Sequence, residues 1–97
     1  MFTGIIEEIG TVRELRSSGD GMELTVACKT VLDDLNVDNS IAIDGVCQTV
    51  TKRTETGFTV FAMAETLKKT TFRQFKPGRR INLERALPAN GRLGGHL

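Results

Sequence analysis

The stretch SIAIDGVCQTVT, residues Ser40 to Thr51, contains the clearest local fold signal in the chain. Two short runs rich in β-branched residues flank the dipeptide Asp44-Gly45, and Asp-Gly favours the two-residue hairpin turn whose residues take positive φ. We therefore predict strands over Ser40–Ile43 and Val46–Lys52, joined by a tight turn. A hairpin of this kind belongs to an antiparallel sheet.

The second strand of this hairpin has two faces of different character. Because side chains alternate along a strand, Val46 and Val50 lie on the same face as Gln48, whereas Cys47 and Thr49 lie on the other. The valines predict that the first face is the core, so the Gln48 amide needs a hydrogen-bond partner or a place near a barrel end. The second face is either an ordinary solvated surface or a docking surface for a ligand, and the pattern alone leaves both open.

Strand signals recur along the rest of the chain. We expect a first strand within Gly4–Leu15, where Gly10 can mark a bulge, and a strictly alternating strand over Met22–Cys28. Two further strands are predicted over Gly57–Met63 and within Lys76–Leu87.

Helical signals are sparse. The stretch Ala64–Phe75 predicts one short helix, and Thr30–Leu35 is compatible with a single helical turn. Six short strands with one brief helix predict an all-β fold, a small six-stranded antiparallel barrel, because closure removes the exposed edges of an open sheet. The chain shows no internal repeat and no domain boundary, so residues 1–97 are expected to form one domain.

The charge balance and composition exclude several classes of protein. Thirteen basic and twelve acidic residues give a net charge of +1, which lacks the basic surface that nucleic-acid binders need. The absence of Tyr and Trp also disfavours stacking on bases. No apolar run approaches membrane length, and the N-terminus does not resemble a signal peptide. We expect a cytoplasmic protein with neither nucleic acid nor membrane as a partner.

Cys28 and Cys47 are the only cysteines, and His96 is the only histidine. Two thiols without C-x-x-C spacing predict neither a disulfide framework nor a metal site. Cys28 ends the alternating strand and is expected to be a small buried hydrophobe.

Five blocks of the sequence together resemble the N-terminal half of riboflavin synthase: MFTGIIEEIG, SIAIDGVCQTVT, AETLKKTTF, INLERAL and the closing GRLGGHL. They occur in the family's order and span almost the whole chain. The resemblance implies a Greek-key barrel, one of two similar barrels that lie in tandem in the full-length enzyme. Residues 1–97 would then be the N-terminal lumazine-binding barrel alone.

The resemblance also implies an activity. Riboflavin synthases transfer a four-carbon unit between two molecules of 6,7-dimethyl-8-ribityllumazine, which yields riboflavin and a ribitylamino-pyrimidinedione, with no metal or organic cofactor. The reaction occurs where an N-terminal barrel meets a C-terminal barrel of a neighbouring subunit. This chain is therefore expected to bind ligand but to catalyse poorly alone, to form a homodimer, and to derive from a homotrimeric parent.

Carried onto this sequence, the family's ligand-binding residues are Gly4, Ile5, Ile6, Ser40, Cys47, Gln48, Thr49, Phe61, Ala62, Met63, Ala64, Glu65 and Thr66. Strand backbone and Thr49 can match the polar edge of a pteridine ring, and Ile6 and Met63 can cover its faces. Glu65 and Thr66 can bind the ribityl hydroxyls at a helix start. Other interpretations stay open: Glu65 as an ordinary first-turn acid, and Met63 as a core residue.

Catalytic roles are not assigned by the sequence. The reaction needs a base and a nucleophile, and Cys47 is a candidate nucleophile without a nearby basic residue in sequence to activate it. His96 belongs to the GGHL block and is not assigned as the base. Gln48 departs from the apolar residue that the family commonly has at this position, which puts local packing in doubt.

The alternative function is that of a non-catalytic lumazine- or flavin-binding protein of the same superfamily. Such proteins share the tandem barrels but diverge from this site pattern more than Gln48 does. An unrelated barrel that binds nucleic acid is disfavoured by the charge and by the aromatic content.

Overall fold

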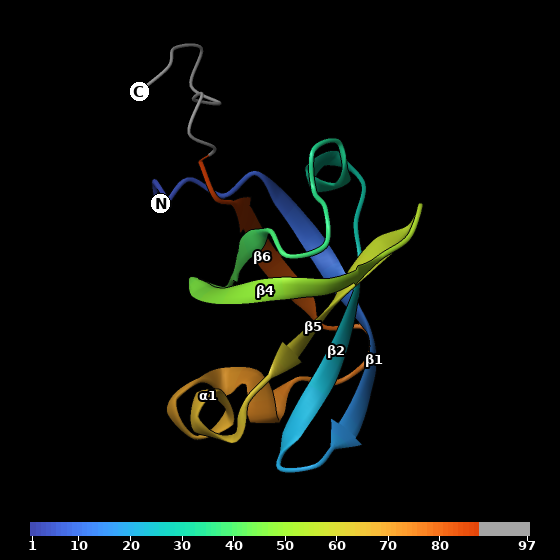
Figure 1. The fold of residues 1–97 in the computed structure, drawn as a ribbon, viewed down its shortest axis with the longest axis vertical. Coiled ribbons are helices and arrows are strands. Elements are labelled where there is room, and N and C mark those ends of the chain that lie inside the picture. Colours follow the sequence, from blue (N-terminus) through green and yellow to red (C-terminus); the bar gives the residue numbers. More distant parts are fainter. Residues whose placement is uncertain (88–97) are drawn as a thin grey trace.

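The computed structural model describes residues 1–87. Over these residues the chain forms a closed barrel of six antiparallel strands in the order β1-β2-β5-β4-β3-β6, with β6 paired to β1 (Figure 1). The strands are β1 Glu8–Ser18, β2 Gly21–Ala27, β3 Ser40–Ile43, β4 Val46–Arg53, β5 Gly57–Ala62 and β6 Arg80–Arg85. The helical elements are η1 Thr30–Leu32, α1 Ala64–Lys69 and η2 Thr71–Gln74. The predicted all-β barrel with one short α-helix is confirmed, and so is the helical turn that begins at Thr30.

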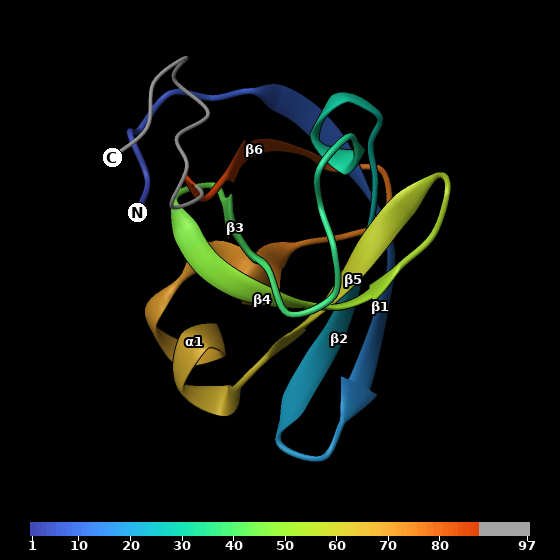
Figure 2. The same ribbon diagram turned by 45° about the horizontal axis from the view of Figure 1, so that its top comes forward.

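The barrel interior is filled by apolar side chains from alternate strand positions. Leu24 and Val26 of β2 are fully buried, and Cys28 is buried just beyond them, which confirms the alternating strand. Figure 2 shows the six strands wrapped around this interior, with α1 beside them next to β4. Phe72 and Phe75 follow α1 and pack into the same core, with their ring centroids 4.8 Å apart.

The β3–β4 hairpin forms as predicted. Asp44 and Gly45 take φ values of 48° and 83°, the positive region that an Asp-Gly turn tolerates. The turn is also fixed from β6, because the Asn82 N–H donates to Asp44 Oδ1 at 2.8 Å. This hairpin therefore has one register, and that register decides which side chains face outward.

Strand β1 runs three residues past its predicted end at Leu15, to Ser18, and it bulges elsewhere than the sequence predicts. It starts at Glu8, and its register with β2 shifts between Val12 and Glu14. The bulge predicted at Gly10 is therefore wrong. Gly10 instead permits close packing, since a Cβ atom there would lie 2.7 Å from Leu83 Cδ1.

The helix predicted over Ala64–Phe75 is in two pieces. α1 ends at Lys69, and Thr70 is extended, with φ −129° and ψ 179°. The Thr70 hydroxyl donates to the Thr66 carbonyl at 2.8 Å and accepts from the Phe72 N–H at 3.2 Å. The prediction of one continuous helix is wrong because these local hydrogen bonds compete with helix propagation.

Within residues 1–87, no helix has the length and apolar character needed to cross a bilayer. The closing block GRLGGHL, and with it His96, lies outside the described residues.

Candidate ligand-binding site

The two faces of β4 differ as predicted. Cys47 and Thr49 are exposed, whereas Val50 is fully buried and Gln48 is only 8% exposed. The Gln48 side-chain nitrogen Nε2 donates to the Cys47 carbonyl oxygen at 2.7 Å. The inward amide thus finds its partner within its own strand, and the predicted faces are confirmed.

Small side chains surround Cys47 and Thr49 on the outer face. Ser40 lies opposite Thr49 and Ala42 lies opposite Cys47 in the β3–β4 ladder. Directly opposed residues of antiparallel strands point to the same face. These four side chains therefore share one face, here called the floor, on which Ala42 is only 6% exposed. Ala42 also lies opposite Glu84 of β6, so the floor continues towards that strand.

The N-terminal segment Thr3–Glu7 lies beside β6, at this edge of the floor (Figure 1). Gly4 and Ile6 line a hollow of about 220 Å³ together with Ala42, Gly45, Asn82, Leu83 and Glu84. Ile5 and Ile6 are 65% and 53% exposed. The structure therefore brings Gly4 and Ile6 against the floor, as one apolar wall beside it.

Glu84 holds this wall in place. Its Oε2 accepts hydrogen bonds from the Thr3 N–H at 2.6 Å and the Thr3 hydroxyl at 2.8 Å, and its Oε1 accepts from the Gly4 N–H at 3.0 Å. Burial alone would raise the pKa of the Glu84 carboxyl, but these hydrogen bonds outweigh burial and hold the pKa below its ordinary value of 4.5. The carboxylate is therefore ionised at neutral pH.

Sequence reasoning missed Glu84. Its place on β6 was predicted, but nothing in the alternation of that strand indicates that a segment some eighty residues earlier in the chain returns to it. The one usable signal is an acidic residue within a predicted strand, and such acids have many other roles.

The run Phe61–Thr66 borders the opposite edge of β4. Within residues 1–87 the β4–β5 ladder ends at Val60, whereas β5 stays paired with β2 as far as Ala62. Beyond Val60 the chain leaves β4 and enters α1, which Figure 1 shows below β4. This part of the predicted site therefore lies along a β4 edge that β5 does not cover.

The side chains at the end of β5 face in different directions. Ala62 is fully buried and can offer only its backbone, whereas Met63 is 65% exposed. The alternative that Met63 is a core residue is therefore wrong. Phe61 is partly exposed, and its ring lies over Gly21 of β2, where a Cβ atom would overlap it.

The first turn of α1 carries the remaining predicted residues. The Glu65 carboxylate forms an exposed ion pair with Lys69, one turn later, at 3.5 Å. Ala64 is half-buried and lines a separate hollow of about 260 Å³ beside α1. The Glu65 carboxylate is thus paired, as an ordinary first-turn acid can be. Its role in binding a ligand stays a prediction.

The predicted residues fall into two groups. One comprises the exposed face of β4 with its neighbours towards β3 and the N-terminal segment, and the other lies beyond the opposite edge of β4. The first group is Gly4, Ile5, Ile6, Ser40, Cys47 and Thr49, with the Gln48 backbone between the last two. The second is the run Phe61–Thr66. That a single ligand touches both groups remains a prediction.

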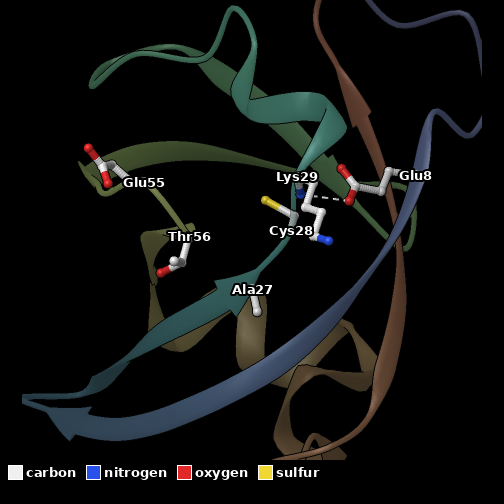
Figure 3. Close-up of a pocket in the computed structure, with 6 residues that line it drawn as sticks. All are labelled: Glu8, Ala27, Cys28, Lys29, Glu55 and Thr56. Carbon is white, nitrogen blue, oxygen red and sulfur yellow. Dashed lines mark hydrogen bonds between the residues drawn. The ribbon is translucent and has the colours of Figure 1, made fainter.

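A separate pocket of about 410 Å³ lies at the end of β2 (Figure 3). It is lined by Glu8, Ala27, Cys28, Lys29, Glu55 and Thr56. The Glu8 carboxylate accepts from the Lys29 N–H at 2.7 Å and the Val31 N–H at 2.9 Å, so it serves to anchor η1. Burial, aided by the Glu8 charge, raises the pKa of the Cys28 thiol to about 12. Cys28 is thus a neutral, buried thiol as predicted, and none of the predicted site residues lines this pocket.

Sequence comparison identifies the class of protein. The lumazine binding domain family matches residues 3–86, most of the chain. The chain therefore belongs to the lumazine binding domain family.

The relatives in this class include riboflavin synthases. This chain is 49% identical over 97 residues to the riboflavin synthase of Bacillus subtilis (strain 168) and 44% identical over 97 residues to that of Actinobacillus pleuropneumoniae. Each comparison covers all of this chain but 45% of the relative, so the chain spans less than half the length of these relatives. The resemblance to riboflavin synthases is confirmed.

Solved structures with the same fold include two LumP complexes. LumP complexed with riboflavin has a TM-score of 0.86 and 23% sequence identity, over 98% of this chain and 51% of LumP. LumP complexed with 6,7-dimethyl-8-(1'-D-ribityl) lumazine has a TM-score of 0.80 and 20% identity, over 97% of this chain and 56% of LumP. At this level of identity the comparison establishes a shared fold.

Proposed function

We propose that this chain is the N-terminal half of a riboflavin synthase and that it binds 6,7-dimethyl-8-ribityllumazine and riboflavin. The observation that carries the proposal is the 49% identity to the Bacillus subtilis riboflavin synthase along the whole chain. The geometry supports it, since a floor of small side chains, two of them with hydroxyls, beside exposed apolar side chains suits a flat heteroaromatic ring. Dismutation needs two barrels that present their lumazines to each other, and this chain, which spans 45% of its riboflavin synthase relatives, is expected to catalyse it poorly alone.

In this proposal the pteridine ring lies over the floor. The hydroxyls of Ser40 and Thr49 and the adjacent strand backbone meet its polar edge, while Ile6 and Met63 cover apolar surface from two sides. Glu65 and Thr66 bind the ribityl hydroxyls. The second lumazine occupies the matching barrel of the parent enzyme, presented by a neighbouring subunit.

The proposal extends to the architecture and the partners of the chain. We interpret the strand order as a Greek key, because β3, β4 and β5 are consecutive neighbours and β6 returns beside β3. Residues 1–97 then constitute one lumazine-binding barrel of a cytoplasmic enzyme. The isolated chain forms a homodimer through the surface that meets a second barrel in a homotrimeric parent.

Riboflavin binding tests the proposed function. Titration of riboflavin with the chain should quench the fluorescence of the flavin, because the ring leaves water for a protein surface. Thr49→Trp places a large ring on the floor and should abolish the quenching. Thr51→Trp is the control, since Thr51 is exposed on the same strand, at the bulge where its hydroxyl donates to the Thr59 carbonyl, and lies outside the predicted site. This variant should quench as the wild type does. Absence of quenching by excess wild-type protein would reject the proposal.

A non-catalytic lumazine- or flavin-binding protein is the second candidate, favoured by the fold shared with LumP. A chimera separates the two. This chain should support lumazine turnover when it replaces the N-terminal half of the Bacillus subtilis riboflavin synthase. A chimera that binds riboflavin but has no turnover would favour the non-catalytic alternative.

A further inference from the structure

The N-terminal segment Met1–Glu7 lies outside the strands and helices, yet β6 and the residues after it hold both of its ends. The Leu87 N–H donates to the Met1 carbonyl at 2.8 Å, and the Glu7 N–H donates to the Leu83 carbonyl at 2.8 Å. The Glu7 carboxylate also pairs with the Arg85 guanidinium at 2.9 Å. Figure 2 shows the segment running beside β6.

Glu84 fixes the middle of the segment. Its buried carboxylate accepts three hydrogen bonds, two from Thr3 and one from Gly4, at 2.6 to 3.0 Å. Hydrogen bonds to a carboxylate are stronger than those between neutral groups. The Glu84 side chain thus fixes the backbone of Thr3 and Gly4, as the hydrogen bonds of a strand ladder would do elsewhere.

The turn that Glu84 stabilises decides where the next two residues point. Gly4 has φ 86°, a conformation that residues with a Cβ atom rarely adopt. The Ile5 N–H donates to the Thr3 hydroxyl oxygen at 3.0 Å, and this hydroxyl donates in turn to Glu84. Ile5 and Ile6 leave this turn exposed, and Ile6 lines the hollow at the edge of the floor.

We infer that Glu84 is a positioning residue of the ligand site: its carboxylate orders Thr3 and Gly4 so that Gly4–Ile6 stand as a preformed wall beside the floor. The inference rests on the proposed function and goes beyond it, because Glu84 acts through the segment rather than on the ligand. A wall that is ordered before binding removes an entropic cost from association. Ligand affinity therefore depends on Glu84.

Three variants test this inference. Glu84→Gln keeps the shape of the side chain but removes its charge and one acceptor oxygen. Thr3→Val removes the hydroxyl, which donates to Glu84 and accepts from the Ile5 N–H, but it keeps the hydrogen bond from the Thr3 N–H to Glu84. Glu14→Gln is the matched control, the same change on β1, where the Glu14 carboxylate lies 3.7 Å from Arg16 and both side chains are exposed. Riboflavin affinity is measured by fluorescence quenching at a temperature where every variant is folded, and amide hydrogen exchange is followed by NMR without ligand.

Glu84→Gln should weaken riboflavin binding about tenfold, the loss expected when hydrogen bonds to a charged group are removed. Exchange at the Thr3 and Gly4 amides should become faster, while the amides of Leu24 and Val26 in the core keep their wild-type protection. Thr3→Val should weaken binding by a smaller factor, and Glu14→Gln should bind as the wild type does.

The outcomes separate the inference from the proposed function. Wild-type affinity in folded Glu84→Gln would overturn the inference and leave the proposed function standing, because a purely structural role changes stability but not the affinity of the folded protein. If Glu84→Gln fails to fold, wild-type affinity in Thr3→Val overturns the inference. If the wild-type chain itself does not quench riboflavin, the proposed function fails, and the ligand role of Glu84 fails with it.

Discussion

At the scale of single residues, Gln48 shows how a polar side chain can occupy a core position. Its amide lies on the inner face of β4 with Val50, and an amide buried without a partner would cost about 1–3 kcal/mol. The hydrogen bond from Nε2 to the Cys47 carbonyl, at 2.7 Å, removes much of that cost. The departure from an apolar residue is therefore accommodated inside the barrel, and the outward face of the strand is left to Cys47 and Thr49.

The two cysteines should differ sharply in reactivity. Cys28 is buried and the pKa of its thiol is raised to about 12, so at about pH 8 on the order of 1 in 10,000 molecules carries its thiolate. Cys47 is exposed on the floor. We predict that iodoacetamide modifies Cys47 alone in the native protein and both cysteines in denaturant, as measured by peptide mass spectrometry.

Two controls accompany this labelling. Bound riboflavin should slow the modification of Cys47, because the proposed site includes its side chain. In Cys47→Ser the native protein should remain unlabelled. Modification of Cys28 in the folded Cys47→Ser variant would contradict the burial assigned to it.

Glu84 predicts a specific pH dependence of stability. Its folded-state pKa lies below the ordinary value of 4.5 because of the hydrogen bonds from Thr3 and Gly4, which outweigh burial. A depressed carboxyl pKa contributes stability that is present above the unfolded-state pKa and is lost as the pH falls through the folded-state pKa. The wild type should therefore exceed Glu84→Gln in free energy of unfolding at about pH 7, and the difference should shrink as the pH falls below 4.5.

Urea unfolding from about pH 7 down to about pH 3 measures this difference. Glu14→Gln, on the barrel exterior, provides the comparison for a general effect of net charge. A stability difference between the wild type and Glu84→Gln that grows as the pH falls would contradict the assignment of Glu84 as an ionised anchor.

At the scale of elements, the strands were predictable wherever hydrophobic alternation and turn chemistry agree. The β3–β4 hairpin and strand β2 follow from such local signals, because the period of two and the Asp-Gly turn are properties of neighbouring residues. The break at Thr70 was not predictable. A threonine can lie within a helix, or its hydroxyl can cap the start of a new one, and the sequence does not distinguish the two. The bulge in β1 near Arg13 was not predictable either, because it depends on the partner strand.

The close approach of β5 to β2 at Gly57 should leave no room for a side chain at this position. A Cβ atom at Gly57 would overlap the carbonyl group of Val26, and backbone cannot move aside as a flexible side chain can. Gly57→Ala should destabilise the barrel by about 3 kcal/mol, the upper range for overpacking. Gly19→Ala, in an exposed turn with φ 58° and nothing within 4 Å of the added Cβ, should cost only about 1–2 kcal/mol.

Urea denaturation of both glycine variants checks this ranking. Equal losses in the two would mean that positive φ matters as much as close backbone approach in this fold. A smaller loss in Gly57→Ala would show that β5 and β2 can separate without a large cost.

At the scale of the whole molecule, the candidate site depends on contacts between distant parts of the chain. The outward position of Cys47 and Thr49 was predicted correctly from alternation along β4. The wall at Gly4–Ile6 requires Glu84, some eighty residues away in sequence, and no local pattern encodes that return. The remaining candidate residues were predicted only through a family resemblance, because side-chain types such as Met63 and Glu65 fit several ordinary roles.

Any lumazine turnover by this chain alone should depend on protein concentration. The proposed reaction joins two lumazines, and one barrel provides one of the two required sites, while the chain spans only 45% of its riboflavin synthase relatives. Turnover by this chain alone therefore requires two copies to present their ligands to each other. Because the fraction of paired chains rises with concentration, lumazine turnover per chain should rise as the protein is concentrated.

Parallel sedimentation should show dimers appearing over the same concentration range. Thr49→Trp, with its floor blocked, should lose the residual turnover at every concentration, whereas Thr51→Trp should retain the wild-type dependence. Turnover per chain that stays constant while the protein passes from monomer to dimer would contradict this prediction. It would mean that a single barrel brings both lumazines together, and the proposed division of the reaction between two barrels would then be wrong.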